Sequence, residues 1–486
     1  MRNLGRICRA YVPVQALCGI MCSMVVSVFA SIPIIPLAAQ QRSQGLAPQS
    51  ALQASAGSTT GARNVRVFTL EECLKIAAAS NLDVQDAVAN ATLSSADQKE
   101  AWGAYLPTAD LTLGYSRTLN TVTGFNLGGT ITEIPVRTPD IFFSNARVGY
   151  TIFNGFIREG LYDQANANYE AAEKTVTQTR RRILNTVRTQ YFNVLRTKQI
   201  VATRREDFEV GKKQLERVKA QFEAGVTAVA AVYTQEADLS NRELAIVQAE
   251  NDVELAKGQL LATLGMNPML AADVTDVQIP QTLGEKELQE FRASIATPEN
   301  AAEEAISKRA DYDAAKSSVL AAEHSLRSSN GRWLPTVSAG FDYRWNGTDV
   351  ASFGQYSQQN LSLVATYTVF DGFGRDAAIQ RSQIRLEQAE LRKRQTEQRI
   401  ASEVQNAYTQ LYAAEKTLDI TARALKSAEQ NFQAAEERFK VGAANILDYT
   451  TANAQLVNAR INRINAVYSY VAAQYQTRFA LGLLEE

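Results

Sequence analysis

The sequence predicts a mixed α/β protein in which one unit, a pair of strands followed by a long helical hairpin, is built twice. Three observations predict this fold class: an internal duplication, alternating strand patterns and helices of unusual length. Residues 150–265 align without a gap with residues 367–482, at a constant offset of 217 (367 − 150). Upstream, Leu106-Pro107-Thr108 recurs as Leu334-Pro335-Thr336, at an offset of 228 (334 − 106). A duplication this even indicates one structural unit built twice.

The N-terminal residues 1–39 have the pattern of a secretory signal peptide. Arginines within the first nine residues precede an uncharged, partly apolar stretch that ends in Leu-Ala-Ala, as signal peptides do. The alternative is a retained membrane anchor, but Pro33 and Pro36 interrupt the apolar run. Residues 40–65 are rich in Gln, Ser, Ala and Gly, which predicts a flexible linker.

Composition excludes several function classes. A net charge of −1 gives no bulk attraction for nucleic acid. The single histidine, His324, would have to carry any His-based metal site or Ser-His-Asp triad alone. No Gly-rich phosphate loop or nucleophile elbow is present in the sequence. The sequence therefore predicts no catalytic, cofactor or metal site and no enzyme, and Cys73, alone once the signal is removed, predicts no internal disulfide.

The first copy opens with a helix and two strands. Thr69, followed by acidic residues, predicts a helix start, and the helical pattern runs to about Gly103. Strict alternation then predicts four strands, at 109–115 and 144–153 in the first copy and at 337–345 and 361–369 in the second. Their lengths suit tilted membrane strands. The alternative is a soluble antiparallel sheet with one face exposed to solvent, which shows the same alternation. The connections 117–143 and 346–359 are polar and predict exposed loops.

Each copy continues into very long helices. The stretch from Arg375 to Val441 lacks both Gly and Pro, and as one helix it would reach roughly 100 Å at 1.5 Å per residue. Apolar residues recur every seven positions, which favours left-handed supercoiling of neighbouring helices. These stripes predict packing rather than a cofactor site. Members include Val187, Val194 and Val201 in the first copy and Val404, Leu411 and Leu418 in the second.

A turn glycine separates the outgoing helix from the returning one in each copy. Gly225 and Gly442 suit the left-handed conformation that closes a helix. The predicted organisation is therefore a first repeat over 66–265, an inter-repeat equatorial segment over 266–300 and a second repeat over 301–486.

The strand count predicts an oligomer. Four strands cannot close a membrane barrel, and an open sheet in lipid would leave unsatisfied edges. Two chains would pool eight strands, whose interior side chains would nearly fill the barrel. Three chains would pool 3 × 4 = 12 strands, so a transport function favours a trimer.

In this order, the motifs resemble the TolC-like outer-membrane efflux protein (outer membrane factor) family over roughly residues 66–486. Each motif is common by itself, and their combination is specific. They are Leu106-Pro107, Leu334-Pro335, Tyr150-Thr-Ile-Phe-Asn-Gly155, Tyr367-Thr-Val-Phe-Asp-Gly372, Leu264-Gly-Met-Asn-Pro268, Arg309-Ala-Asp-Tyr-Asp-Ala-Ala315 and Phe439-Lys-Val-Gly-Ala-Ala-Asn-Ile-Leu-Asp448.

The resemblance implies a homotrimer with a 12-stranded β-barrel in the outer membrane, in contact with its lipid, continued by a 12-helix α-barrel across the periplasm. It also implies a periplasmic adaptor (membrane fusion) protein at the helical tip and an inner-membrane RND or ABC transporter as the energy source. The chain would then be the passive exit duct of a tripartite efflux or type I secretion system. The alternative is a secreted coiled-coil scaffold, structural or adhesin-like, with a small soluble β domain.

The resemblance places a periplasmic gate at Asp448, six residues after Gly442, where acidic residues ring the entrance of such ducts. Three aspartates around one axis would attract cations and repel anions. The first copy has Ala231 at the equivalent position, so the ring would be three-fold. The alternative is an ordinary carboxylate at a helix N-terminus. Alanines occupy positions where some family members carry polar locks, which implies a gate held in another way; they are Ala230, Ala231 and Ala444.

Overall fold

The computed structural model describes most of the chain after residue 65. The described residues are 66–118, 122–127, 130–135, 140–275, 285–295, 297, 300–348, 356–441 and 443–484. The predicted signal peptide, the predicted linker and Gly442 lie outside them. All described residues belong to one compact unit, Arg63–Glu486.

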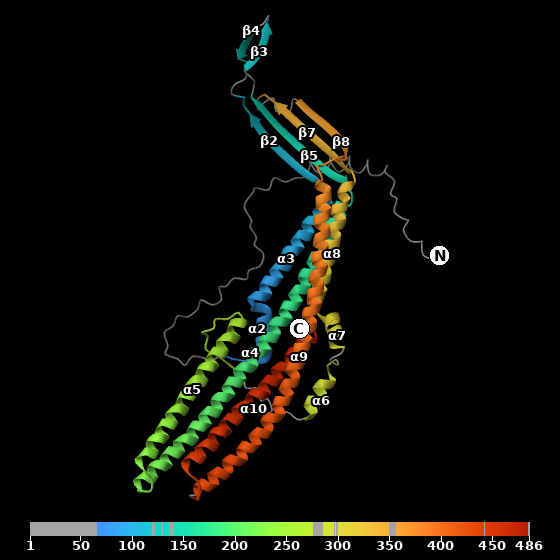
Figure 1. Cartoon of the computed structure of the whole chain (residues 1–486). Coiled ribbons are helices and arrows are strands. Elements are labelled where there is room, and N and C mark those ends of the chain that lie inside the picture. Colours follow the sequence, from blue (N-terminus) through green and yellow to red (C-terminus); the bar gives the residue numbers. More distant parts are fainter. Residues whose placement is uncertain are drawn as a thin grey trace, which may run out of the picture. The chain divides into compact units, whose positions relative to one another are not determined.

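A four-stranded antiparallel sheet joins the two copies. Its order is β2 (Thr108–Ser116), β5 (Ile141–Phe153), β7 (Thr336–Gly347) and β8 (Tyr356–Thr366). Each copy supplies one hairpin, and β5 pairs with β7 between them (Figure 1). The four predicted strands are confirmed, but β8 ends at Thr366 rather than at residue 369. Because Thr366 pairs with Thr336, the first residue of β7, the chain beyond it has no strand to pair with.

The connection 117–143, predicted as a loop, contains a second hairpin. Strand β3 (Val122–Leu127) pairs with β4 (Thr130–Pro135) in antiparallel register. In the sequence, two glycines separate stretches with Thr, Val and Ile, which is a hairpin pattern. The connection predicted as a loop therefore contains regular strands. The 11 additional residues of the first copy (228 − 217) fall between the Leu-Pro motif and Tyr150, where this hairpin lies.

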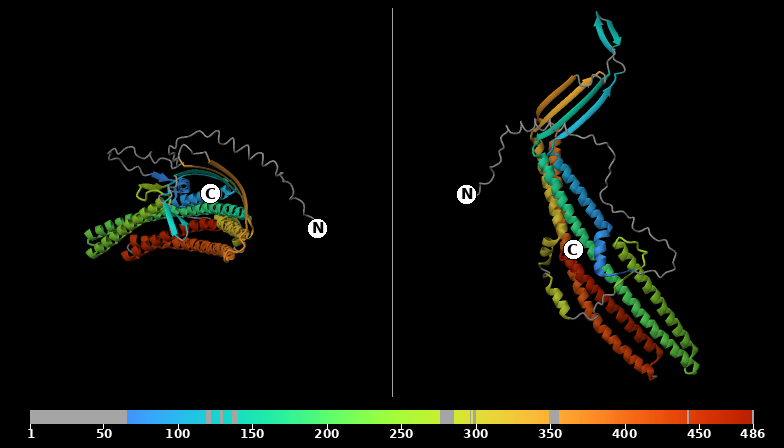
Figure 2. Two further views of the ribbon diagram at one scale, coloured as in Figure 1. Left: turned by 90° about the horizontal axis from the view of Figure 1, so that it is seen from above. Right: turned by 180° about the vertical axis from the view of Figure 1, so that it is seen from behind.

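Below the sheet, the long helices repeat with equal lengths. Helices α4 (Ile157–Glu223) and α9 (Gly374–Lys440) have 67 residues each, and α5 (Val229–Thr263) and α10 (Ile446–Ala480) have 35 each. The returning helices are thus about half as long as the outgoing ones. Alongside the sheet-proximal half of α4 run α3 (Leu82–Gly103) and α8 (Ala310–Asn330), and α8 also packs on α9. The two further views agree on this arrangement (Figure 2).

The short helices before the sheet are also duplicated. Helix α2 (Leu70–Ser80) begins at Thr69, which forms a capping box with Glu72, as the sequence predicts. The predicted single helix breaks at Asn81, because this residue leaves the helical conformation (φ −65°, ψ 132°) and caps α3 with its side chain. In the second copy, α7 (Ala301–Lys308) and α8 follow the same plan and are separated at Arg309.

The inter-repeat segment is structured where it is described. Its strand β6 (Ala272–Val274) pairs in parallel with β1 (Arg66–Phe68), and α6 (Glu285–Ala293) follows. Lys198 of α4 lies 3.3 Å from the Asp273 carboxylate, and Arg292 of α6 pairs with Glu415 of α9. Positions 198 and 415 are equivalent in the two copies (415 − 198 = 217). The same site on each long helix therefore anchors the segment, with opposite charge.

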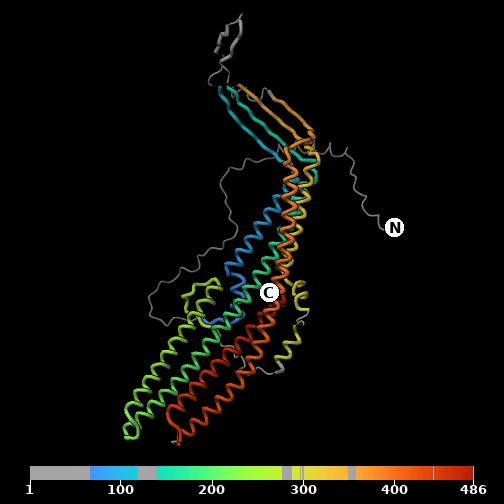
Figure 3. The backbone as a smooth tube through the Cα atoms, in the orientation of Figure 1, coloured from blue at the N-terminus to red at the C-terminus, as the bar shows by residue number. Residues whose placement is uncertain are grey.

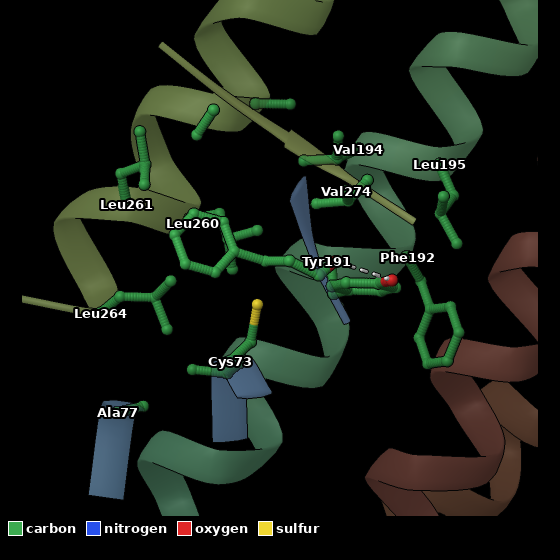
Figure 4. Close-up of a cluster of buried hydrophobic side chains, with 14 of the residues drawn as sticks. Cys73, Ala77, Tyr191, Phe192, Val194, Leu195, Leu260, Leu261, Leu264 and Val274 are labelled. Atoms are coloured by element: carbon green, nitrogen blue, oxygen red, sulfur yellow. Dashed lines mark hydrogen bonds between the residues drawn. The ribbon is translucent and has the colours of Figure 1, made fainter. Parts of the chain in front are cut away.

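The largest apolar cluster lies where α2, α4, α5 and β6 meet. Figure 4 shows Cys73, Tyr191, Leu260 and Val274 gathered around this junction. The Tyr191 side chain is fully buried, and its hydroxyl donates to the Thr275 carbonyl at 2.8 Å. Burial of Tyr191 therefore fixes the inter-repeat segment against the middle of α4. Within the described ranges, no helix is both long and apolar enough to cross a membrane.

Candidate functional site

The two helical turns lie side by side at the end of the molecule remote from the sheet (Figure 3). In the first turn, Gly225 has φ +73°, and the Val226 amide donates to the Gln221 carbonyl at 2.9 Å. This is the hydrogen bond of a Schellman closure. The equivalent bond runs from the Ala443 amide to the Arg438 carbonyl, at 2.8 Å. Helices α4 and α9 therefore end with the same hydrogen bond, although Gly442 itself is not among the described residues.

Apolar packing behind the two turns uses different side chains. The first copy packs the aliphatic residues Leu215, Val218 and Val232 together. The second copy packs aromatic rings: Tyr449 lies 5.4 Å from Phe439 and 5.5 Å from Phe432, measured between ring centroids. Tyr449 is buried, which raises the pKa of its hydroxyl. The hairpin of α9 and α10 is thus closed by an aromatic cluster near its tip.

Asp448 lies in the first turn of α10, close to this cluster. Its backbone amide donates to the side-chain oxygen of Asn445, the N-cap residue, at 2.8 Å, and the residue is exposed. A carboxylate here is favoured by the partial positive charge at a helix N-terminus. In the first copy, Ala228 occupies the N-cap position without a side-chain hydrogen bond, and Ala231 replaces the aspartate. The capped, acidic helix start therefore belongs to the second copy only.

A buried polar cluster, which we call the polar joint, connects the two copies above the tip. It consists of Asp207 on α4, Arg242 on α5 and Asn453 on α10. The Asn453 amide donates to Asp207 Oδ1 at 2.7 Å, and Arg242 Nη1 donates to the Asp207 carbonyl at 2.9 Å and also to its carboxylate. Arg242 Nε donates to Asp238 at 2.8 Å. Asp207 and Asn453 are 9% and 3% exposed, so the joint is shielded from water.

A glycine in the middle of α4 makes room for the polar joint. A Cβ atom on Gly211 would lie 2.7 Å from Cδ of Arg242, which is closer than side chains approach. Glycine inside a helix costs about 1 kcal/mol relative to alanine, so a specific contact here offsets a local loss of helix stability. Sequence reasoning missed this cluster, although the signal is present. The second copy has alanine at the positions equivalent to Asp207, Gly211 and Arg242, namely Ala424, Ala428 and Ala459.

The polar joint is the lowest of three buried or partly buried side-chain hydrogen bonds between α4 and α10, which we call the polar ladder. A further, exposed contact joins Arg460 of α10 to Glu206 of α4 at 3.4 Å. The upper rungs are Asn185 to Gln476 at 2.9 Å and Arg196 to Asn465 at 3.0 Å. On α4 the rungs are 11 residues apart (196 − 185 and 207 − 196). Eleven residues are close to three helical turns, so the three side chains lie along one face of α4.

The strand-to-helix junctions are strained in the same way in both copies. Gly155 and Phe156, like Gly372 and Phe373, have positive φ angles between 64° and 73°. An arginine follows each junction and stacks on an aromatic ring: Arg158 lies 4.4 Å above Tyr105, and Arg375 lies 4.2 Å above Trp333. Tyr105 and Trp333 are equivalent at the offset of 228.

Chemistry-bearing groups are dispersed in the part of the chain that the structure describes. No group of three His, Cys, Asp or Glu side chains that could hold a metal ion is found there. His324 lies 3.8 Å from the Asp163 carboxylate on the α4–α8 contact, and Cys73 lies in the main apolar cluster. The described elements form helical walls and turns joined by interhelical polar contacts.

Both copies of the duplication match a known protein family. The sequence model of the family described as outer membrane efflux protein matches residues 73–266 and 301–483. Comparison with curated proteins gives no significant match.

Several solved structures have a similar fold. The CmeC outer membrane channel of Campylobacter jejuni is 16% identical, with a TM-score of 0.71 over 85% of each chain. The outer membrane protein VceC of Vibrio cholerae is 18% identical, with a TM-score of 0.70 over 85% of this chain and 96% of that chain. The MtrE outer membrane channel of Neisseria gonorrhoeae is 14% identical, with a TM-score of 0.67 over 85% of this chain and 89% of that chain. At these identities the likeness shows the fold, and the predicted fold class is confirmed.

Proposed function

Because the chain belongs to the outer membrane efflux protein family, we propose that it is the outer-membrane exit duct of a tripartite efflux or type I secretion system. Proteins of this family are channels, and cargo passes through them without covalent chemistry. One observation carries the proposal. Several contacts that one repeat makes within the chain have no equivalent for the other repeat, although the residues that would make them are present. A ring of chains would supply the missing contacts, which favours a duct over a secreted scaffold.

Packing of the sheet-proximal helices shows the incomplete contacts. Helix α8 of the second copy packs closely along α4 of the first. The equivalent contact would place α3 of the first copy along α9 of the second. Among the described elements, α3 packs on α4 and has no comparable contact with α9. In a ring, α3 of a neighbouring chain would fill this place.

The glycines at the strand-to-helix junctions point to the same ring. A Cβ on Gly155 would lie 2.2 Å from the Gly331 carbonyl, so the two backbones touch. The equivalent pair is Gly372 with Gly103, and within the described single chain a Cβ on either of them would meet no atom closer than 4 Å. We infer that Gly372 approaches Gly103 of a neighbouring chain in a homotrimer.

The sheet has the edges and the surface that a pooled barrel requires. Strands β2 and β8 are its two edges, and their leucines are unusually exposed: Leu113 by 68% and Leu361 by 80%. Three sheets joined edge to edge would pair every strand and give 3 × 4 = 12 strands in contact with outer-membrane lipid. The helices would continue into the periplasm, where an adaptor (membrane fusion) protein and an inner-membrane RND or ABC transporter would complete the pathway.

The domain organisation follows from this proposal. Residues 66–265 and 301–486 form the two repeats of each subunit, and residues 266–300 form the equatorial segment between them. Six repeats from three chains would then surround one axis. Asp448, near the tip of each second repeat, would form a three-fold acidic ring at the periplasmic gate.

Assembly is tested by comparing Gly155→Ala with Gly372→Ala. We expect Gly155→Ala to lower the yield of folded subunit, because its clash lies within the chain. Both variants place a Cβ at a positive φ angle and share that strain, but Gly372→Ala adds no clash within the chain. We therefore expect it to leave more folded subunit than Gly155→Ala and to reduce the trimer fraction in detergent, measured by native mass spectrometry. A wild-type chain that is monomeric and needs no detergent would instead support the scaffold.

The gate is tested by Asp448→Ala in planar bilayers. Loss of three carboxylates should change single-channel conductance and weaken its dependence on the cation, because charge at a constriction sets local ion concentration. The matched variant is Ala231→Asp, which adds three carboxylates in the first copy and should strengthen cation preference. If Asp448→Ala leaves both properties unchanged, the acidic gate is wrong.

A further inference from the structure

We propose that the polar ladder is a clamp: it keeps α4 and α10 joined when the tip widens, so that the duct opens between α9 of one chain and α5 of the next. The inference rests on the proposed function, because the second joint exists only in the trimer. It assigns different tasks to two joints that the duplication makes equivalent. The in-chain joint is between α4 and α10, and the between-chain joint is between α9 and α5.

The rungs of the clamp are present at one joint only. The residues of α9 equivalent to Asn185, Arg196 and Asp207 are Ser402, Ala413 and Ala424. The alanine side chains carry no polar atoms, and serine is too short to replace asparagine across a helix interface. On α5, the positions equivalent to Gln476, Asn465 and Asn453 are Gln259, Gln248 and Glu236. The exposed Glu206–Arg460 contact has Arg423 and Glu243 as its equivalents, so the between-chain joint keeps opposite charges at its surface but lacks partners for the three rungs of the ladder.

The lowest rung is the strongest of the three. Asp207 accepts from both Arg242 and Asn453 in a buried setting. Hydrogen bonds with a charged partner, such as a guanidinium, are roughly twice as strong as neutral ones. Arg242 of α5 pairs with Asp207 of α4 and with Asp238 of its own helix, so α5 is tied to α4 at the same level. These charged partners all belong to the first copy, and Asn453 fastens α10 to them.

Burial along the two long helices shows which contacts one chain completes by itself. On α4 the buried residues continue from Ile183 down to Val218. On α9 the last buried residue is Leu418, which is equivalent to Val201 (418 − 217). Below this level the neighbour of α9, other than α10, would be α5 of another chain in the proposed trimer. Separation of the lower part of α9 from that α5 breaks no ladder of the kind that holds α4 to α10, because its residues supply no equivalent rungs.

Matched disulfides test the clamp. The trimer would carry Cys73→Ala and either Asp207→Cys with Asn453→Cys, or the equivalent pair Ala424→Cys with Glu236→Cys. The probe is the largest KCl conductance reached under voltage in planar bilayers, before and after reduction. We expect the oxidised 207–453 pair to conduct within about twofold of its reduced form. The oxidised 424–236 pair should conduct about tenfold less than its reduced form, because a locked constriction limits ion flow.

The outcomes separate the clamp from the duct. The clamp is overturned if the 207–453 disulfide blocks conductance as strongly as the 424–236 disulfide, or if the latter has no effect. If the 424–236 pair forms no covalently linked subunits on oxidation, the proposed trimer itself is wrong.

A second variant avoids the loss of the buried aspartate. In Asn453→Ala, amide hydrogen exchange over 446–460 should rise about tenfold, because the end of α10 is released from α4. The control is Asn431→Ala, which removes an exposed hydrogen bond from α9 to Gln455 on α10 and should leave this exchange unchanged. Equal exchange in Asn453→Ala and the wild type would contradict the clamp.

Discussion

The tip-proximal halves of the two repeats have the same helix lengths and the same terminal hydrogen bond, but their side chains differ. In the first repeat, α4 is packed by α5 on one side and by α10 on the other, and its contacts include the polar joint. In the second repeat, α9 packs on α10, and rings of Phe432, Phe439 and Tyr449 close the hairpin. The backbone plan is therefore set by the repeat, whereas the strength of each joint is set by substitutions within it.

A second pair of equivalent positions shows the same difference near the middle of the molecule. Asn81 and Arg309 both lie between two helices and both donate to the last turn of a returning helix, Asn81 to the Thr263 carbonyl and Arg309 to the Ala480 carbonyl. Arg309 is 2% exposed and also pairs with Asp311 and Glu403. One repeat thus uses a neutral cap where the other uses a buried charge network.

The largest expected effect comes from substituting the two equivalent residues Arg309 and Asn81. Arg309→Met should destabilise the fold by about 3–5 kcal/mol, because it removes a buried, paired guanidinium and leaves the half-buried carboxylates of Asp311 and Glu403 with fewer partners. Asn81→Ala should cost about 1 kcal/mol, the usual loss of an N-cap. Denaturant unfolding of the detergent-solubilised protein measures both values. Equal losses would contradict the assignment of different roles to the two residues.

The aromatic and aliphatic tips are compared by Tyr449→Ala and Val232→Ala. Removal of the buried ring should cost about 3 kcal/mol, and removal of the smaller side chain about 2 kcal/mol, because the lost contact area and the cavity are larger for tyrosine. Hydrogen exchange at residues 432–449 and 215–232 measures the two losses separately. A larger loss in the first repeat would show that the aromatic cluster does not dominate tip stability.

Gly211, the helix glycine of the polar joint, is compared with its equivalent Ala428 by exchanging glycine and alanine and measuring the change in stability. Ala428→Gly should destabilise α9 by about 1 kcal/mol from helix propensity alone. Gly211→Ala gains that propensity but displaces Arg242, so we expect no net stabilisation and faster exchange near Asp207. A stabilised Gly211→Ala protein with unchanged exchange would show that the polar joint does not need this space.

The smallest effect concerns Cys73, whose equivalent in the second repeat is Ala301 (301 − 73 = 228). Burial raises the pKa of the Cys73 thiol to about 11. The folded state therefore keeps the thiol protonated at pH 8, and alkylation should be slow until the protein unfolds. Because the folded pKa is raised, this group's contribution to stability is present below about pH 9 and declines as the pH rises toward 11. Cys73→Ala should remove that decline, which pH-dependent unfolding measures.

The sequence by itself determined the features that are local or periodic. These are the duplication, the four alternating strands, the lengths of α4 and α9, the turn at Gly225 and the helix start at Thr69. Each depends on residues close together in the chain or on a repeat period, so it can be read without knowing the contacts. The hairpin of β3 and β4 was also local, but its strands are short and lie in a polar connection that reads as a loop.

The tertiary structure decided which distant residues meet. The parallel pair of β1 and β6 has only three residues per strand, which is too short for a periodic signal. Strand β1 opens the first repeat, whereas β6 lies in the inter-repeat segment about 200 residues later. Asn81 and Arg309 gain their roles from carbonyls that belong to other helices. The polar joint requires Asp207, Arg242 and Asn453 to converge from three helices, so no spacing along the chain reveals it. Local periodicity therefore fixed the elements, and the packing of α4 between α5 and α10 decided where polar contacts hold the two repeats together.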